Sequence, residues 1–423
     1  ATTRIDTNDN NKIDRVEWVI PGLSNQTFEV LAESSTAAFY SNLDSMKPSL
    51  LFLPSNASDK FAESVALGDI NGNGRADIII GATSASRGAT SNTGAVYIFY
   101  DRKYNTSKIF NLDTLNANVT IYGAGTLDAL GGYIATGDVN GDGKADIAAG
   151  AGGETTIWVI YGANYTNGAI IDLSFLSANL SITNGGNSFG SRYIDMGDEN
   201  GDGKADILMG CNLCDPGGRT NAGQAFLIYG KAYTHGKIIN IGTQGANVTI
   251  SGQSNNDELG SSVALGDIDG DGKKEIIVGA HKAEQASTGN VGIVYIFYGR
   301  NYTSPKTFDF SVIPFANVSI FGNSTVSGNL GNALASKDIN GDNKDEVIMT
   351  APGVSTTATS SGSAYILYGK GYADGSKINL SVSGVNMNVT ISGLASNFLG
   401  DSVAVGDYNN DGKNDTIIGC QNC

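Results

Sequence analysis

Hydrophobic residues fall in short runs separated by polar, glycine-rich turns, and no segment shows the 3.6-residue period of an amphipathic helix. A run at residues 64–67 is followed by an acidic loop and then by a β-branched run at 78–80 that ends at Gly81. The same order recurs at 262–265 and 276–278. Short β-branched runs bounded by turn residues are typical of buried strands. Each acidic loop is therefore predicted to connect the two strands of a β-hairpin.

Two more strand patterns follow each hairpin. The third strands are predicted at residues 94–100, 156–162, 224–230, 292–298 and 363–369. The fourth strands are predicted at 118–121, 179–182, 247–250, 317–320 and 388–391. Four antiparallel strands in a repeat of ~60–70 residues are typical of a β-propeller blade. We expect an all-β, seven-bladed β-propeller that forms a single domain over 1–423. Its predicted repeats are 1–58, 59–123, 124–184, 185–252, 253–322, 323–393 and 394–423.

The acidic loops, numbered 1 to 7 along the chain, share one nine-residue spacing. Asp or Asn occupies positions 1, 3 and 5, and an acid occupies position 9. These residues are Asp6, Asn8, Asn10 and Asp14; Asp69, Asn71, Asn73 and Asp77; Asp138, Asn140, Asp142 and Asp146; Asp198, Asn200, Asp202 and Asp206; Asp267, Asp269, Asp271 and Glu275; Asp338, Asn340, Asp342 and Glu346; and Asp407, Asn409, Asp411 and Asp415.

This spacing suits a hard cation, because alternate residues of a tight loop turn their oxygens inward and Ca²⁺ takes 6–8 oxygen ligands. Position 7 offers a backbone carbonyl, from Lys12, Arg75, Lys144, Lys204, Lys273, Lys344 and Lys413. Position 6 is Gly, or Asn in two loops, which suits a positive φ. We predict up to seven Ca²⁺ ions. Mg²⁺ is the weaker alternative as the bound ion. The alternative to a metal site is that the loops are solvated Asx turns that bind no ion. The loops are not EF-hands, because position 12 lacks the bidentate Glu.

The dipeptides that flank the hairpins carry a family resemblance. Leu-Gly or Phe-Gly precedes the first strand at 130–131, 189–190 and 259–260, and Gly-Ala follows the second strand at 81–82 and 279–280. The chain thus resembles the FG-GAP repeats of integrin α-subunit propellers and their microbial relatives. The resemblance implies a seven-bladed propeller with calcium in the hairpin loops. That family includes adhesion receptors, some fungal lectins and appendages of enzymes, so it leaves the function open.

Composition narrows the range of functions. The 57 glycines fit many tight turns, and the net charge of −16 disfavours nucleic acid or an anionic membrane as a partner. No hydrophobic run is long enough to insert into a membrane as a helix. His235 and His281 lie in no catalytic motif, and many of the carboxylates belong to the loops. We therefore expect no enzyme activity and no catalytic residues.

The cysteines and glycosylation motifs indicate an extracellular or cell-surface protein. Local disulfides are predicted in two Cys-x-x-Cys pairs, Cys211 with Cys214 and Cys420 with Cys423, and bridges between chains are the alternative. Asn-x-Ser/Thr motifs begin at Asn25, Asn56, Asn105, Asn118, Asn164, Asn179, Asn247, Asn301, Asn317, Asn323, Asn379, Asn388 and Asn414. Five of these begin the fourth strands, which we expect to be outermost with the Asn facing solvent. A chain rich in Asn, Ser and Thr also produces such motifs by chance.

These features predict a secreted, calcium-stabilised glycoprotein that serves as a structural or adhesive surface module. Its partners would be other protein chains, with glycans as a second possibility. The alternative is a lectin that binds carbohydrate between blades. Repeat seven has no third and fourth strands, so its sheet edge needs another explanation. Three explanations stay open: the chain is part of a longer protein, the blade has only two strands, or a neighbouring subunit donates strands and builds a filament or surface array.

Overall fold

The structure is a computed structural model that describes most of the chain as β-strands joined by turns. The described residues are 2–5, 15–18, 27–28, 50–54, 56, 58–100, 108–112, 117–150, 155–185, 193–284, 289–302, 305–312, 316–323, 327–355, 360–380, 387–394, 396–407 and 412–421. Within them, helical turns occur only at α2 (Ile241–Gln244) and η2 (Pro216–Gly218). None of the described helices has the length and apolar character needed to cross a membrane. The predicted all-β class is confirmed.

Each predicted hairpin is present. The first strands are β5 (Phe61–Gly68), β10 (Tyr133–Gly137), β15 (Ile194–Gly197), β20 (Leu259–Gly266), β25 (Leu334–Lys337) and β30 (Leu399–Gly406). They pair antiparallel with β6 (Asp77–Ala82), β11 (Asp146–Gly150), β16 (Asp206–Cys211), β21 (Glu275–Ala280), β26 (Glu346–Ala351) and β31 (Asp415–Cys420). In each pair the last residue of the first strand faces the position-9 acid, as Gly266 faces Glu275. The register therefore places the acidic loop at the tip of the hairpin.

The third and fourth strands follow in antiparallel order. The third strands are β7 (Ala95–Phe99), β12 (Thr156–Ile160), β17 (Gln224–Ile228), β22 (Ile293–Phe297) and β27 (Ser363–Leu367). The fourth strands are β9 (Val119–Tyr122), β14 (Leu180–Thr183), β19 (Val248–Ser251), β24 (Val318–Phe321) and β29 (Val389–Ser392). The predicted positions of these strands are confirmed.

A fifth strand differs from the prediction of four strands per blade. Between its third and fourth strands, each of repeats 2 to 6 sends a short strand back to the preceding sheet. These strands are β8 (Lys108–Asn111), β13 (Ala169–Asp172), β18 (Lys237–Asn240), β23 (Lys306–Asp309) and β28 (Ser376–Asn379). They pair in parallel with the fourth strand of the preceding repeat, as β13 pairs with β9. The fourth strands β9, β14, β19 and β24 are therefore not the outermost strands, and their edges are covered by the neighbouring repeat.

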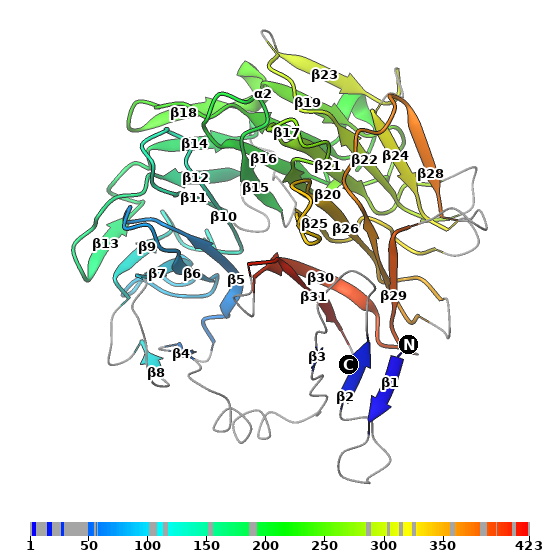
Figure 1. Ribbon diagram of the computed structural model, residues 1–423. Helices are drawn as coiled ribbons and strands as arrows, with labels where there is room; N and C mark the ends of the chain where they lie inside the picture. The colour runs from blue at the N-terminus through cyan, green and yellow to red at the C-terminus, as the bar shows by residue number, and fades with distance from the viewer. Residues whose placement is uncertain are drawn as a thin grey trace.

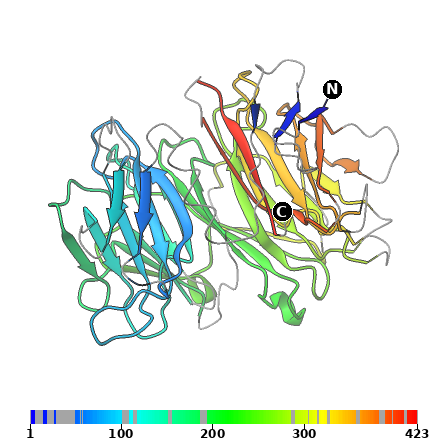
Figure 2. The ribbon, with the colours of Figure 1, turned by 90° about the horizontal axis from the view of Figure 1, so that it is seen from below.

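The sheets follow one another around a ring (Figure 1). The first strands lie nearest the centre, and each contacts the first strand of the next sheet from β5 to β30. Viewed after a turn of 90°, the sheets stand side by side with their strands running between the two faces of the ring (Figure 2). This arrangement is consistent with a β-propeller.

Packing between neighbouring sheets supplies the hydrophobic core. One cluster joins Leu208 and Leu227 of one sheet to Val263, Leu265 and their neighbours in the next sheet. Equivalent clusters join the other described sheets in pairs. The core of this fold thus lies between blades, so each blade depends on its neighbours for burial.

Tyrosines at the ends of the third strands add polar contacts between the blades. The Tyr161 hydroxyl accepts the backbone N–H of Tyr233 at 2.8 Å, and the Tyr233 hydroxyl donates to the carbonyl of Tyr229 at 2.7 Å. The same pattern joins Tyr100 to the backbone of Tyr165 and Tyr229 to that of Tyr302. These tyrosines therefore join the side chains of one blade to the backbone of the next.

The two ends of the chain form smaller sheets. The strands β1 (Thr2–Ile5), β2 (Arg15–Trp18) and β3 (Thr27–Phe28) form one sheet, and β4 (Leu50–Leu53) pairs with β8. β3 pairs antiparallel with β2, as a third strand does with the second, and β4 pairs in parallel with β8, as the other fourth strands do with the fifth strands. In the part of repeat seven that the structure describes, β30 and β31 form a two-stranded sheet.

The substitution Tyr161→Phe should lower the free energy of unfolding by about 1 kcal/mol, because it removes a partly buried hydroxyl hydrogen bond between two blades and leaves the ring packing intact. Urea unfolding followed by circular dichroism measures this difference. The control is Tyr122→Phe, at a half-buried tyrosine whose hydroxyl makes no hydrogen bond to the described residues. An equal effect of both substitutions would contradict a specific role for the Tyr161 hydroxyl.

Candidate metal sites

The described acidic loops lie at hairpin tips with one shared geometry. Loops 2 to 6 are described in full, at 69–77, 138–146, 198–206, 267–275 and 338–346. Loop 1, with the predicted ligands Asp6, Asn8, Asn10, Lys12 and Asp14, lies outside the described residues. Asn409 and Asp411 of loop 7 lie outside them as well. The structure therefore bears on five complete loops.

The carboxylate at position 1 accepts hydrogen bonds from backbone N–H groups of its own loop. In loop 3, the Asp138 side chain accepts the backbone N–H groups of Gly141, Asp142 and Gly143 at 2.7–3.0 Å. Asp198 accepts the corresponding three groups of loop 4. These bonds hold the backbone of each loop in a tight arc around the position-1 carboxylate.

Glycine at position 6 meets the conformational requirement of this arc. Gly143 and Gly203 both have φ of +84°, in the left-handed region. In loop 6 the residue is Asn343, at φ of +65°, and Asn is the next most tolerant residue there. The predicted positive φ at this position is confirmed.

The acid at position 9 is the buried anchor of each of loops 2 to 6. The Asp146 side chain accepts the N–H of Val139 at the start of the loop and the N–H of Gly162 just after the third strand, at 2.9 and 2.8 Å. Asp206 makes the equivalent two bonds to Glu199 and Gly230. Both carboxylates are fully buried. Position 9 therefore fixes the loop to its own sheet.

Burial also perturbs the acid–base behaviour of these anchors. Desolvation raises the pKa of Asp146 and of Asp206 to about 7 and that of Glu275 to about 8, although backbone N–H donors act in the opposite direction. The neighbouring position-1 carboxylates, Asp138 and Asp198, raise the pKa values of Asp146 and Asp206 further. A cation in the loop would favour the ionised form.

The donor set fits a hard divalent cation. One carboxylate oxygen from each of Asp267, Asp269 and Glu275 lies within 4.8 Å of the others. In loop 4, the side-chain oxygen of Asn200, at position 3, is buried and has no hydrogen-bond partner among the described residues. Oxygen atoms of this kind suit Ca²⁺, which when bound would neutralise the converging carboxylates. Positions 1, 3, 5 and 9 and the carbonyl of position 7 would hold it.

The lysine at position 7 has an additional role that the sequence did not indicate. The Lys144 side chain lies over Gly72 of the preceding loop, and Lys204 lies over Gly141 in the same way. Each loop is thus covered in part by a residue of the next one.

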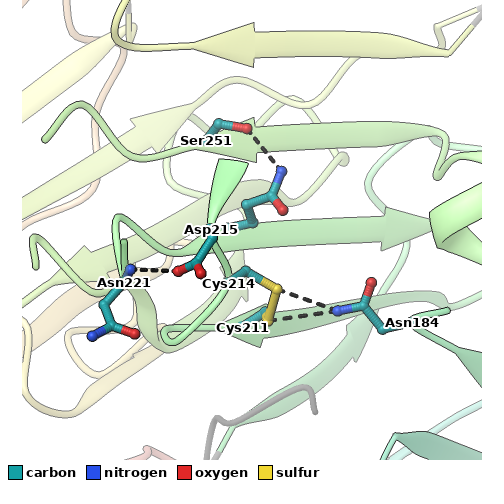
Figure 3. The surroundings of a disulfide bond; sticks show 7 residues. Asn184, Cys211, Cys214, Asp215, Asn221 and Ser251 are labelled. Carbon is teal, nitrogen blue, oxygen red and sulfur yellow. Dashed lines mark hydrogen bonds between the residues drawn. A yellow bond between two sulfur atoms is a disulfide. The ribbon is translucent and has the colours of Figure 1, made fainter. Parts of the chain in front are cut away.

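The predicted disulfide between Cys211 and Cys214 is present (Figure 3). It closes the turn after β16, and both cysteines are buried. The Asn184 side chain, from the preceding repeat, donates to the Cys214 sulfur at 3.2 Å. Cys420 is also disulfide-bonded, and its predicted partner Cys423 lies outside the described residues.

The fourth-strand glycosylation motifs have a structural use that we did not predict. In all five, the Asn side-chain oxygen accepts the backbone N–H of the tyrosine that follows the third strand, at 2.7–2.9 Å. The expected solvent-facing orientation is wrong for Asn118 and Asn317, which are 8% and 4% exposed. Their side-chain nitrogens donate to Asn167 and Asp374.

The remaining glycosylation motifs differ in exposure. Asn56, Asn164, Asn301 and Asn388 are exposed, and Asn179, Asn247, Asn323, Asn379 and Asn414 are half-buried. Asn25 and Asn105 lie outside the described residues. Glycosylation stays a prediction for all these sites.

Two buried or partly buried polar clusters were not predicted from the sequence. Glu199 occupies position 2 of loop 4, where the other complete loops have Ile or Val, and its buried side chain accepts the N–H of Arg300 in the next repeat. His281 lies 3.7 Å from Glu258, which also binds Lys282 at 2.6 Å. An alignment of the repeats shows Glu199 as a charged residue at a position that is hydrophobic in the other complete loops, so the sequence does contain a signal for it. The cluster of His281, Glu258 and Lys282 has no sequence equivalent in the other repeats and gives no such signal.

In the metal-free chain, we expect the free energy of unfolding to fall as the pH rises from about 5 to about 8. The folded-state pKa values of Asp146, Asp206 and Glu275 lie above the ordinary values of 3.8 and 4.5, so the folded chain holds these protons more tightly than the unfolded chain. That stabilisation is lost as the pH passes through about 7. Thermal melts in EDTA across this range measure it. Asp146→Asn should flatten the profile, and stability that rises with pH would contradict the argument.

Comparisons with known proteins agree with the repeat pattern. The model of the FG-GAP repeat family matches residues 61–99, 133–171, 259–297 and 330–367. Curated relatives include the phosphatidylinositol-glycan-specific phospholipase D of Bos taurus, 28% identical over 43% of this chain and 21% of that protein. The rat and human proteins of the same name are 30% and 29% identical over 38% of this chain and 18% of their own length.

Two solved structures show lower similarity. One is a lectin of Agrocybe aegerita described as recognising non-reducing terminal N-acetylglucosamine, with a TM-score of 0.36 and 16% identity over 85% of this chain and 75% of that chain. The other is the exotype rhamnogalacturonan lyase YesX, with a TM-score of 0.34 and 12% identity over 88% of this chain and 63% of that chain.

The curated relatives contradict the prediction that the chain is not an enzyme, because they carry the name of one. That prediction was based on the two histidines of this chain, His235 and His281, which lie in no catalytic motif. The chain spans about a fifth of the length of these curated relatives. Four segments of the chain thus match the FG-GAP repeat, and the hairpins and loops are consistent with that repeat family.

Proposed function

We propose that this chain is a calcium-loaded, seven-bladed propeller that works outside the cell as a structural or adhesive module. The observation that carries the proposal is the repeated geometry of the loops. In loop 5, carboxylate oxygens of Asp267, Asp269 and Glu275 converge at the hairpin tip, and in loops 3 and 4 a buried acid at position 9 anchors the loop to its sheet. Such a site gains stability from a divalent cation, because the ion offsets the repulsion among the carboxylates.

Exposed hydrophobic residues support closure of the ring by the first repeat. Val65 and Leu67 of β5 are 65% and 66% exposed, whereas their counterparts Val263 and Leu265 in β20 are each 4% exposed against the preceding blade. Ile417 of β31 is 59% exposed, and its counterpart Ile277 is fully buried. The two ends of the described ring therefore present apolar faces that a seventh blade, built from residues 1–58, would cover.

The buried disulfide supports an oxidising, extracellular location, since such bonds are rare in reducing compartments. The tyrosines do not support the lectin alternative, because many of them make contacts between blades and are not free to stack on a sugar. A glycan array would test it directly. A filament built by strand donation at β31 stays a proposal of the same kind and would be visible by electron microscopy of native material.

The relatives favour a second candidate, in which the chain is the propeller part of a longer enzyme of the phospholipase D type. The test is release of a glycosylphosphatidylinositol-anchored reporter protein from vesicles by the purified chain. Release that is lost on heat denaturation would support catalysis by this chain. No release, with calcium bound and the fold intact, would leave the structural or adhesive module as the function of this chain.

Removal of calcium should lower the melting temperature of the chain sharply, by ten degrees or more, since several ions would each stabilise the folded state by mass action. Native mass spectrometry should count at least five bound ions, one for each complete loop. Differential scanning calorimetry with and without EDTA measures the shift, and magnesium replacement is the control for ion identity. An unchanged melting curve and no bound calcium would refute the proposal.

Glycans, if added, should avoid the buried motifs. We expect occupancy at the exposed Asn164 and Asn301 and none at Asn118 and Asn317, because the side-chain nitrogens of the last two are committed to hydrogen bonds. Peptide mapping after enzymatic deglycosylation in heavy-oxygen water identifies occupied sites in material secreted from eukaryotic cells. Full occupancy at Asn118 would show that modification precedes folding and would contradict the expectation.

A further inference from the structure

The acidic loops of neighbouring blades are joined directly by backbone hydrogen bonds. The N–H of position 8 in each loop donates to the carbonyl of position 1 in the preceding loop. The four bonds run from Ala145 to Asp69, Ala205 to Asp138, Lys274 to Asp198 and Asp345 to Asp267, at 2.7–2.9 Å. Loops 2 to 6 are thus one hydrogen-bonded series, and each bond ends on a residue whose side chain is a candidate ligand.

Loops 5 and 6 have a second bond, made by a side chain. The Asp345 carboxylate accepts the backbone N–H of Asp267 at 2.9 Å, in addition to the bond that its own N–H makes to the Asp267 carbonyl. The same carboxylate pairs with Lys274 at 3.1 Å, and it is 13% exposed. Asp345 therefore holds the position-1 residue of loop 5 from both sides of its backbone.

Asp345 is not a candidate ligand itself. It occupies position 8, where loops 2, 3 and 4 have Ala76, Ala145 and Ala205. Its two neighbours in the chain, Lys344 at position 7 and Glu346 at position 9, are candidate ligands of loop 6. An ion in loop 6 would fix both neighbours and so fix Asp345 between them.

We propose that cation binding in adjacent loops is positively coupled, and that Asp345 is the positioning residue that couples loop 6 to loop 5. The inference rests on the proposed calcium binding. An ion in loop 6 orders Asp345, which orders Asp267 and prepares loop 5 for its own ion. Coupling between two binding sites is reciprocal, so an ion in loop 5 favours binding in loop 6 to the same degree.

Repulsion between the two ions acts against this coupling. Loop 5 has four ligand carboxylates, Asp267, Asp269, Asp271 and Glu275, and loop 6 has three, so both loops still attract a cation after the neighbouring loop is filled. The proposed positive sign requires that ordering of the shared hydrogen bonds outweighs the repulsion between the ions.

A luminescent ion can report on loop 5 alone. Position 7 binds through its backbone carbonyl, so Lys273→Trp places a sensitiser beside the ion without removing a ligand. Terbium luminescence excited through this tryptophan follows occupancy of loop 5 at equilibrium, and competition with calcium gives the calcium affinity. The same reporter combined with Asp271→Ala, which removes a loop 5 ligand, supplies the background signal.

Loss of the loop 6 ion should weaken loop 5. In the reporter chain, Asp342→Ala removes a loop 6 ligand and should raise the calcium concentration at half-saturation of loop 5 about 5-fold. Asp345→Ala should give a similar shift, and the two substitutions together should not add, because both remove the same coupling. Asp345→Asn keeps an oxygen acceptor for the Asp267 N–H and should retain most of the affinity. The control is Asp401→Ala, which removes one exposed charge from β30.

The outcomes separate the two claims. Shifts no larger than that of Asp401→Ala, or fully additive shifts, overturn the coupling and leave calcium binding intact. If neither terbium luminescence nor bound calcium is detected, the proposed calcium function fails and the coupling fails with it. If Asp345→Ala does not fold, the effect of Asp342→Ala on loop 5 is measured in the chain with Asp345 and in the Asp345→Asn variant. A loop 5 affinity that does not change in either chain overturns the coupling.

Discussion

A buried carboxylate at position 9 of each fully described acidic loop is the constraint on which the structure depends. Asp146 and its counterparts accept backbone N–H groups from both the loop and the third strand, so they fix the hairpin tip to the sheet. The same burial makes their ionised form unfavourable unless positive charge is near. A loop built in this way has the geometry of a cation site even before an ion arrives, and it is least stable when it is ionised and empty.

The rest of the fold propagates that local geometry around the ring. The hydrophobic core lies between sheets, tyrosine hydroxyls reach from one blade to the backbone of the next, and a fifth strand of each repeat pairs with the preceding sheet. Adjacent loops are also hydrogen-bonded to each other. A change in one loop therefore has a physical route to its neighbours through the backbone.

Much of this architecture could be predicted from the sequence because it repeats. Strand patterns, the nine-residue loop spacing and the positive φ at Gly143 and Asn343 each follow from local residue types, and the Cys211–Cys214 bridge follows from short spacing in the chain. The fifth strands could not be predicted in the same way, since segments such as 169–172 are short and pair with a different repeat. The burial of Asn118 depends on that pairing, so its motif suggested an exposed position. The two histidines also gave no indication that the relatives are named as enzymes. Those relatives are about five times longer than the segment that aligns with this chain.

The central claim is that the loops bind calcium through positions 1, 3, 5, 7 and 9. The most direct measurement is a crystal structure of the chain grown in calcium, with anomalous diffraction data collected at a wavelength where calcium scatters strongly. The account predicts one anomalous peak in each of the five complete loops, surrounded by oxygen ligands at about 2.3–2.6 Å from the ion. Loops that hold only water, with the position-9 acids still buried, would contradict it.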